Sequence, residues 1–394
     1  MIKLINAKVI TSKGVSNNKC VVIGNEHIIY VGDDTKHMQC DTIDLKGNYV
    51  SAGFIDLHVH GGAGSSFMDC DQISFKKVVK YHEKQGTLNL MPTSLTAANN
   101  EIYQFLELYT QMKSNDSVKD SLLGVHMEGP FLSTNKCGAQ DGLFCTKVDV
   151  DECQKYLDKC SDIKRMTIAP EMDEGFQLAH YLRERNISVS AGHTDCLYET
   201  MTKALNSGYD MITHMYSSMN GITIINGFRN AGAIEAILLN DDVCVELIAD
   251  GKHLPAPIIE LVYKLKGKDN IIFVSDAMRA TGTDAKESYI GKKIESNKVI
   301  IEDGVAKMKE RKCLGGSITP LNKMVEFVYK NSNISLSDIV TMVTETPAKK
   351  MGVINELGSI SAGKYADIIV FDEDIEILVS IKRGKIIKNL LMGV

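Results

Sequence analysis

Hydrophobic and polar positions follow two different rhythms along the chain. Residues 1–52 hold short apolar runs separated by polar turns, such as KLINAKVIT and CVVIGNEHIIYVG, a pattern typical of β-strands. Residues 348–394 repeat this rhythm in ADIIVFD and EILVSIKRGKIIK. Neither end has enough strands to bury a sheet by itself. We therefore predict that residues 1–52 and 348–394 together form one small β-sandwich domain.

Residues 53–347 show strand-like apolar runs that alternate with longer amphipathic stretches, such as QISFKKVVKYHEKQG and LYETMTKALNSG. The apolar runs cover residues 54–59, 88–93, 122–127, 165–169, 187–191, 211–215, 243–248 and 270–275. Consecutive strand-then-helix units predict an α/β fold with a parallel sheet, and this number of units favours a (β/α)8 TIM-like barrel. An open, doubly wound sheet is the alternative. A polar stretch near residues 283–310 predicts a hairpin insertion after the last strand.

Composition narrows the classes of protein that fit. A chain of 394 residues can hold a barrel of about 250 residues and a small second domain. A net charge of −6, without clustered Lys and Arg, argues against a nucleic-acid partner. We expect no membrane span and no secretory signal, because no apolar run approaches the required length. Ten scattered cysteines without a Cys-x-x-Cys pair suit a reducing compartment, so we expect a cytoplasmic protein.

The segment GFIDLHVHGG places His58 and His60 at the end of the first apolar run. Residues two apart on a strand project from the same face, so both imidazoles can bind one metal ion from one side. Imidazole nitrogen favours zinc, iron, nickel or copper over magnesium or calcium. The pair alone is equally consistent with a chance pair in a loop.

Residues able to do chemistry follow the later apolar runs as well. Six of the ten histidines lie at these ends, and in a barrel all strand ends meet at the active-site face. Glu128, His193 and His214 offer one carboxylate and two imidazoles, the ligand set of a catalytic zinc-type site. His58 and His60 would add a second position, with Glu128 as a bridge.

The remaining polar residues at these ends have other expected roles. Asp276 is the candidate proton carrier for a water molecule whose pKa the metal lowers. We expect His253 to bind substrate by a hydrogen bond and His126 to be structural. His82 and His180 lie in helical stretches, where we expect exposed or helix-packing roles.

Taken together, the motifs resemble the amidohydrolase superfamily, and within it the N-acetylglucosamine-6-phosphate deacetylase family. The matching segments are GFIDLHVHGGAG, GVHMEGPFL, SAGHTD, ITHMYSSMN, LIADGKHLP, VSDAM, LGGSITPL and GSISAGKYADIIVFD. The resemblance implies hydrolysis of the acetamido group of N-acetyl-D-glucosamine 6-phosphate, with zinc or iron as one or two ions per subunit. It also implies a homodimer in which Arg229 serves the sugar phosphate of a neighbouring subunit and His253 contacts substrate.

Two departures from the family pattern affect the expected substrate contacts. Gln140 stands where some members have histidine; its amide can donate a hydrogen bond to the acetyl oxygen but cannot carry charge. Ser217 and Ser218 stand where the family often has Asn-Ala, so we expect sugar contacts there through hydroxyl or backbone groups.

Three alternatives stay open on the sequence. An N-acetylgalactosamine-6-phosphate deacetylase would share these motifs. A cyclic amide hydrolase is less favoured, because many such members use a carboxylated lysine from the fourth strand, and residues 165–169 contain no lysine. A non-catalytic binding protein on the same scaffold would be expected to lose ligands or Asp276, and none is missing.

Overall fold

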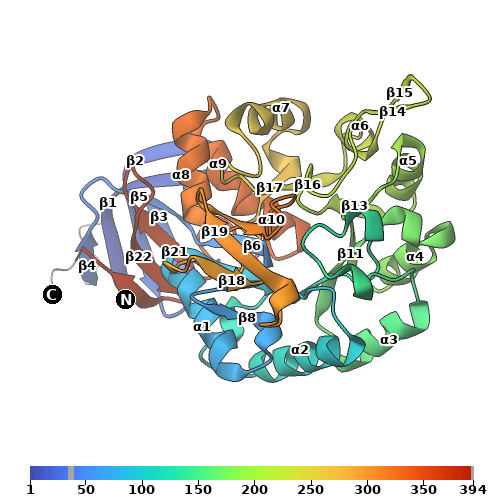
Figure 1. Ribbon diagram of the computed structural model, residues 1–394. Coiled ribbons are helices and arrows are strands. Elements are labelled where there is room, and N and C mark those ends of the chain that lie inside the picture. The colour runs from blue at the N-terminus through green and yellow to red at the C-terminus, as the bar shows by residue number, and fades with distance from the viewer. Residues whose placement is uncertain (34–39, 392–394) are drawn as a thin grey trace.

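The two ends of the chain share one sheet. The computed structural model describes residues 1–33 and 40–391. The eight-stranded sheet has the order β23-β22-β21-β5-β1-β2-β3, with β4 paired to β1. Its strands are β1 (Ile2–Thr11), β2 (Gly14–Gly24), β3 (His27–Gly32), β4 (Asp41–Asp44), β5 (Tyr49–Ala52), β21 (Ile368–Phe371), β22 (Ile377–Lys382) and β23 (Lys385–Asn389). Figure 1 shows these first and last strands side by side.

The junction between the ends is the antiparallel pair β5–β21, in which Ala52 lies opposite Ile368. Alternate residues of the sheet, among them Leu4, Val21 and Val370, form an apolar core separate from the main one. Main-chain hydrogen bonds therefore join residues from both ends of the chain in one sheet.

A second set of strands is parallel. It comprises β6 (Phe54–Val59), β9 (Thr87–Pro92), β10 (Val125–Glu128), β11 (Ile163–Ile168), β12 (Ser188–Ala191), β13 (Tyr209–Ile212), β16 (Cys244–Leu247) and β17 (Ile271–Phe273). β6 pairs with β9, and the order β10-β11-β12-β13-β16-β17 forms a continuous sheet. Each of these strands overlaps one predicted apolar run.

Isolated parallel bridges connect the two parts of this set. The pair Thr93↔His126 joins the end of β9 to β10, and Val59↔Ala277 joins β6 to the residues after β17. The parallel pairings thus lead from β6 through every strand and back to β6. Their carboxyl ends all open toward one face, which positions the residues described below.

The helices lie outside the parallel strands (Figure 1). They are α1 (Gln72–Lys84), α2 (Asn99–Met112), α3 (Val150–Lys159), α4 (Gln177–Arg183), α5 (Tyr198–Asn206), α6 (Ala233–Leu239), α7 (Ala256–Lys266), α8 (Leu321–Asn331), α9 (Leu336–Met342) and α10 (Glu345–Lys350). α1 illustrates their origin: the Asp71 side chain caps its first turn by accepting from the Ser74 N–H, and Phe75, Val78 and Val79 bury one face.

The segment predicted as a hairpin contains three antiparallel strands, β18 (Glu287–Tyr289), β19 (Lys298–Glu302) and β20 (Val305–Met308). The predicted hairpin corresponds to β19 and β20, and β18 adds a strand at its edge. Two further short pairs occur, β7 (Gly61–Gly62) with β8 (Ser65–Ser66) and β14 (Thr223–Ile225) with β15 (Phe228–Asn230).

A buried polar cluster fastens the terminal sheet to the parallel strands. The Lys382 ammonium lies 2.6 Å from Asp367 Oδ2 and donates to Asn89 Oδ1 at 2.8 Å. Asn89 belongs to β9 and the two charged residues to the end of the chain, so the contact crosses between the two parts. Across the described ranges, no helix is long and apolar enough to cross a membrane, and all ten cysteines are free thiols.

Candidate functional site

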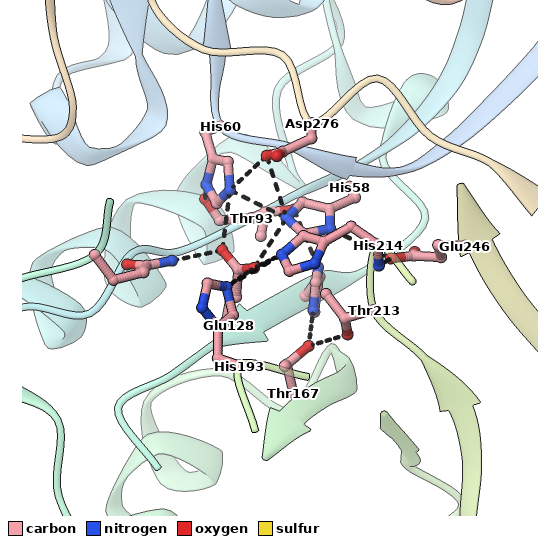
Figure 2. Close-up of polar contacts among 12 residues, drawn as sticks. His58, His60, Thr93, Glu128, Thr167, His193, Thr213, His214, Glu246 and Asp276 are labelled. Carbon is pink, nitrogen blue, oxygen red and sulfur yellow. Dashed lines mark hydrogen bonds and ion pairs between the residues drawn. The ribbon is translucent and has the colours of Figure 1, made fainter. Parts of the chain in front are cut away.

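Predicted site residues from five strands converge at the carboxyl ends of the parallel set. His58 lies in β6 and Glu128 ends β10, while His193, His214 and Asp276 follow β12, β13 and β17. Figure 2 shows their polar atoms pointing toward one centre. Residues far apart in the sequence, such as His58 and Asp276, are thus brought within contact distance, as the strand-end prediction required.

Glu128, His193 and His214 form the first group of converging ligand atoms. Glu128 Oε1 lies 3.1 Å from His193 Nε2 and 3.0 Å from His214 Nε2. The two imidazole nitrogens are 3.1 Å apart. All three side chains are buried. This is the set that the sequence predicted for the principal metal.

His58, His60 and Glu128 form the second group. His60 Nε2 lies 3.1 Å from Glu128 Oε2, and His58 Nε2 lies 3.4 Å from Glu128 Oε1. The two Nε2 atoms are 3.1 Å from each other. Glu128 faces both groups, as a bridging carboxylate would.

The hydrogen bonds on the far side of the rings determine which nitrogens face this centre. Nδ1 of His60 lies 3.3 Å from the carbonyl oxygen of Thr93, and Nδ1 of His193 lies 2.9 Å from that of Lys136. A carbonyl oxygen only accepts, so both rings carry a proton on Nδ1. In the neutral ring the lone pair is then on Nε2 and points at the Glu128 carboxylate.

Lone pairs and a carboxylate that face one another at about 3 Å need a positive charge between them. The pKa shifts of Glu128 and His58 also indicate that a positive charge is favoured at this centre. Burial alone raises the pKa of Glu128, but His58, His193 and His214 outweigh it and hold that pKa well below its usual range. Burial lowers the pKa of His58, but the Glu128 and Asp276 carboxylates raise it well above its usual value. The donor set and its electrostatics therefore fit a bound cation.

Asp276 lies beside the second group, with Oδ1 3.3 Å from His60 Nε2 and 3.6 Å from His58 Nε2. Its backbone has a positive φ of 44°, and those of His193 and His214 are 48° and 28°. Residues with a side chain rarely adopt this conformation, which costs about 1–3 kcal/mol each and is found mainly at functional sites. Three of the predicted site residues therefore have a backbone conformation that is typical of functional sites.

A cavity of about 210 Å³ opens above these atoms. Its wall includes His60, Glu128, Gln140, His193, His214, Ser217, Ser218, His253 and Asp276. His253 is oriented by Asp250, whose Oδ2 lies 2.8 Å from its Nδ1. Tyr289, Ile290 and Gly291 of the inserted segment also line the cavity, so this segment contributes to the wall.

Comparison with known proteins adds the family. The model of the amidohydrolase family matches residues 49–393. The chain belongs to the amidohydrolase family. This amidohydrolase is 31% identical over 341 residues to the N-acetylglucosamine-6-phosphate deacetylase of Bacillus subtilis (strain 168), covering 85% of this chain and 83% of that protein.

Two other similar proteins bear on its function. The N-acetylgalactosamine-6-phosphate deacetylase of Escherichia coli O157:H7 is 25% identical over 326 residues, which cover 82% of this chain and 84% of that protein. The crystal structure of N-acetylglucosamine-6-phosphate deacetylase from Pasteurella multocida superposes with a TM-score of 0.90 at 28% identity, covering 98% of this chain and 100% of that one. The resemblance predicted from the motifs is confirmed. Amidohydrolases are metal-dependent hydrolases, and the two ligand groups agree with that.

Gln140 of this amidohydrolase contacts the ligand set directly. Its Nε2 donates to Glu128 Oε2 at 2.6 Å, and its Oε1 accepts from the Thr96 N–H at 2.8 Å. The predicted bond to an acetyl oxygen is compatible with this position, because an amide nitrogen has a second N–H. The bond to Glu128 was not foreseen.

Arg229 does not lie in the cavity wall. It belongs to the exposed β14–β15 hairpin, where Ile224 and Phe228 are 70% and 77% exposed. Within one subunit the structure therefore does not bring Arg229 to the site, and the predicted phosphate contact requires a second subunit.

His126, His82 and His180 belong to neither ligand group. His126 Nε2 and Thr167 Oγ1 share a hydrogen bond of 2.7 Å. Burial, together with the smaller effect of the nearby Arg165 charge, lowers the pKa of His126 well below the usual value. This agrees with the structural role expected for it. His82 packs in a buried position with Nε2 3.0 Å from the carbonyl oxygen of Gly61, and His180 is exposed.

Sequence reasoning missed three charged residues near the site. Arg165 and Glu246 form a buried ion pair beneath the ligand groups, and Arg279 lines the cavity while pairing with Asp69. For Arg165 and Glu246 the available signal was a charged residue inside an apolar run, in RMTIAP and VCVELIAD. Such a residue is almost never fully buried unless it is paired.

Proposed function

We propose that this amidohydrolase hydrolyses the acetamido group of N-acetyl-D-glucosamine 6-phosphate to glucosamine 6-phosphate and acetate, in amino-sugar catabolism. The observation that carries the proposal is the placement of Asp276 against two overlapping His/Glu groups in the wall of one cavity. The names of the Bacillus subtilis and Pasteurella multocida relatives support the substrate.

We also propose that residues 53–347 form a (β/α)8 barrel. The bridge Val59↔Ala277 supports closure, because an open doubly wound sheet has two unpaired edges. Residues 1–52 and 348–394 would form the small β-sandwich, supported by the apolar core that they share.

A divalent transition metal, zinc or iron, would be held by Glu128, His193 and His214, and a second ion by His58, His60 and Glu128. When bound, the metal would act as a Lewis acid that polarises the acetyl carbonyl and lowers the pKa of water. The donor set of four imidazoles and one carboxylate suits these metals better than magnesium or calcium.

The chain's own residues would manage protons and orientation. Asp276 Oδ1 would take the proton of the attacking water, whose oxygen bonds to the acetyl carbon. The carbon–nitrogen bond then breaks, and Asp276 would return the proton to the departing sugar nitrogen. Gln140 would donate its second N–H to the acetyl oxygen.

Binding of the sugar would use the outer part of the cavity. His253, Ser217 and Ser218 lie in its wall and would bond sugar hydroxyls. In a homodimer, Arg229 of the partner subunit would bind the phosphate, because its planar guanidinium can donate two parallel bonds. The exposed apolar side chains of β14 and β15 support such a contact with a second copy. We expect the dimer to work in the cytoplasm.

The test is release of acetate from N-acetylglucosamine 6-phosphate, its galactosamine epimer and unphosphorylated N-acetylglucosamine. The proposal predicts the highest kcat/KM for the glucosamine 6-phosphate and a large loss without phosphate. Preference for the epimer would instead assign the alternative suggested by the Escherichia coli O157:H7 relative. Turnover of none of the three would remove the substrate assignment and leave another amidohydrolase reaction, such as cyclic amide hydrolysis.

A further inference from the structure

A buried ion pair lies directly beneath the candidate metal centre. Arg165 of β11 donates from Nη1 to Oε1 of Glu246 on β16, and both side chains are 0% exposed. The second terminal nitrogen, Nη2, donates to Ser190 Oγ at 2.9 Å and Thr213 Oγ1 at 3.0 Å. Arg165 is thus fixed by three strands, and it can only donate.

The second oxygen of Glu246 reaches both ligand groups (Figure 2). Oε2 lies 3.3 Å from His58 Nδ1 and accepts from the His214 backbone N–H at 3.3 Å. Because the Arg165 charge keeps the Glu246 carboxyl group ionised, both of its oxygens can only accept hydrogen bonds. His58 must then carry its proton on Nδ1, and its Nε2 lone pair faces His60 and Glu128.

We propose that Arg165 and Glu246 form a positioning pair that selects the metal-binding tautomer of His58. The pair controls metal affinity mainly at the His58/His60 position, where Glu246 contacts a ligand ring, because at the Glu128/His193/His214 position it contacts only the backbone N–H of His214. This inference rests on the proposed metal-dependent function. Neither residue touches the cavity, so neither acts on substrate.

Glu246→Gln gives a sharp test because an amide has one oxygen and one nitrogen. Arg165 requires an acceptor, so the amide oxygen must face it, and the NH₂ group then faces His58 Nδ1. His58 Nδ1 must then accept a hydrogen bond from this NH₂ group, so the ring proton moves to Nε2. A proton on Nε2 prevents that nitrogen from binding a metal. The NH₂ group also meets the His214 N–H, so some main-chain adjustment is expected there.

The experiment measures zinc binding to the stripped protein by competition with a chromophoric chelator, and cobalt binding by visible absorption. The wild type is expected to bind two equivalents, and Glu246→Gln to lose about 10–100-fold in affinity for one of them. Ser190→Ala is the matched control: it removes one Arg165 contact without touching Glu246, and both affinities should stay within about twofold of wild type.

A double variant keeps the test valid if Glu246→Gln fails to fold. Arg165→Met with Glu246→Leu removes both charges together, which buried pairs tolerate far better than loss of one partner. It should lose the same equivalent, since His58 Nδ1 no longer has an acceptor. Wild-type affinities in either folded variant, or a wild type that binds one equivalent, would overturn the inference. A wild type that binds no metal would instead overturn the proposed function.

Discussion

Replacing Asp276 by asparagine should abolish most turnover while leaving the fold intact. The backbone around Asp276 is held by its own N–H, which donates to the His58 carbonyl at 2.9 Å, and by its carbonyl, which accepts from the Ser317 N–H at 2.8 Å. Both bonds survive the substitution. Asparagine also has nearly the same volume, so the positive φ and the cavity wall should be retained.

The expected loss follows from what the amide cannot do. Asp276 Oδ1 lies 3.3 Å from His60 Nε2, at the edge of the ligand groups where the attacking water must be deprotonated. General acid–base catalysis contributes about 10²–10⁴-fold to a rate. At 1.36 kcal/mol for each factor of ten, the barrier should rise by about 3–5 kcal/mol. The metal ligands are unchanged, so metal content should stay the same.

The assay is steady-state acetate release with N-acetylglucosamine 6-phosphate, together with metal analysis of the same samples. Asp276→Asn should lower kcat and keep its metal. Asp284→Asn, which removes an exposed carboxylate away from the cavity, is the control and should keep wild-type kcat. A kcat within tenfold of wild type in a metal-loaded Asp276→Asn enzyme would refute the proton-transfer role.

Three further predictions concern stability. Burial lowers the pKa of His82 to about 4, against 6.5 unfolded, so the unfolded chain binds more protons below pH 6.5 and stability falls as the pH falls from there toward 4. At pH 5 the loss of unfolding free energy should be about 2 kcal/mol. Urea unfolding should therefore show a smaller difference in stability between pH 7 and pH 5 in His82→Gln than in the wild type. An equal difference in the two proteins would contradict the lowered pKa of His82. Asp367→Ala leaves the Lys382 ammonium buried without its carboxylate, and should cost about 3–5 kcal/mol in unfolding free energy, with partial recovery in Asp367→Ala/Lys382→Met. No recovery in the double variant would place the loss elsewhere. Stripping the metal should lower the Tm, and zinc restored at 100 times its Kd should return about 2.7 kcal/mol; a Tm that does not respond to zinc would argue against a metal in the native state.

Much of the site could be predicted because its residues follow the strands. Glu128, His193, His214 and Asp276 come at or just after apolar runs, and parallel strands bring their carboxyl ends to one face. The spacing of two residues placed His58 and His60 on one face of a strand, and the ligand residues at the other strand ends made the pair a predicted metal site. The strand pattern also predicted the pairing of both chain ends, because neither could bury a sheet alone.

The rest depends on contacts that leave no local pattern. Arg165 and Glu246 are 81 positions apart, and each is a charged residue among apolar neighbours in its strand. Gln140 comes from a loop, and its bond to Glu128 depends on how that loop crosses the cavity. The inserted segment gained a third strand because β18 lies beside β19, which the hairpin pattern alone did not specify.

The dependence of acetate release on added metal is the most direct test of metal-dependent hydrolysis at this site. Stripped enzyme should be assayed with N-acetylglucosamine 6-phosphate while zinc or iron is added from zero to several equivalents per subunit. We expect almost no acetate release without metal, and a rate that rises as metal fills the Glu128/His193/His214 position. Glu128→Gln should show no rise over the same range. Full activity in the stripped enzyme, or an equal response in Glu128→Gln, would contradict the account.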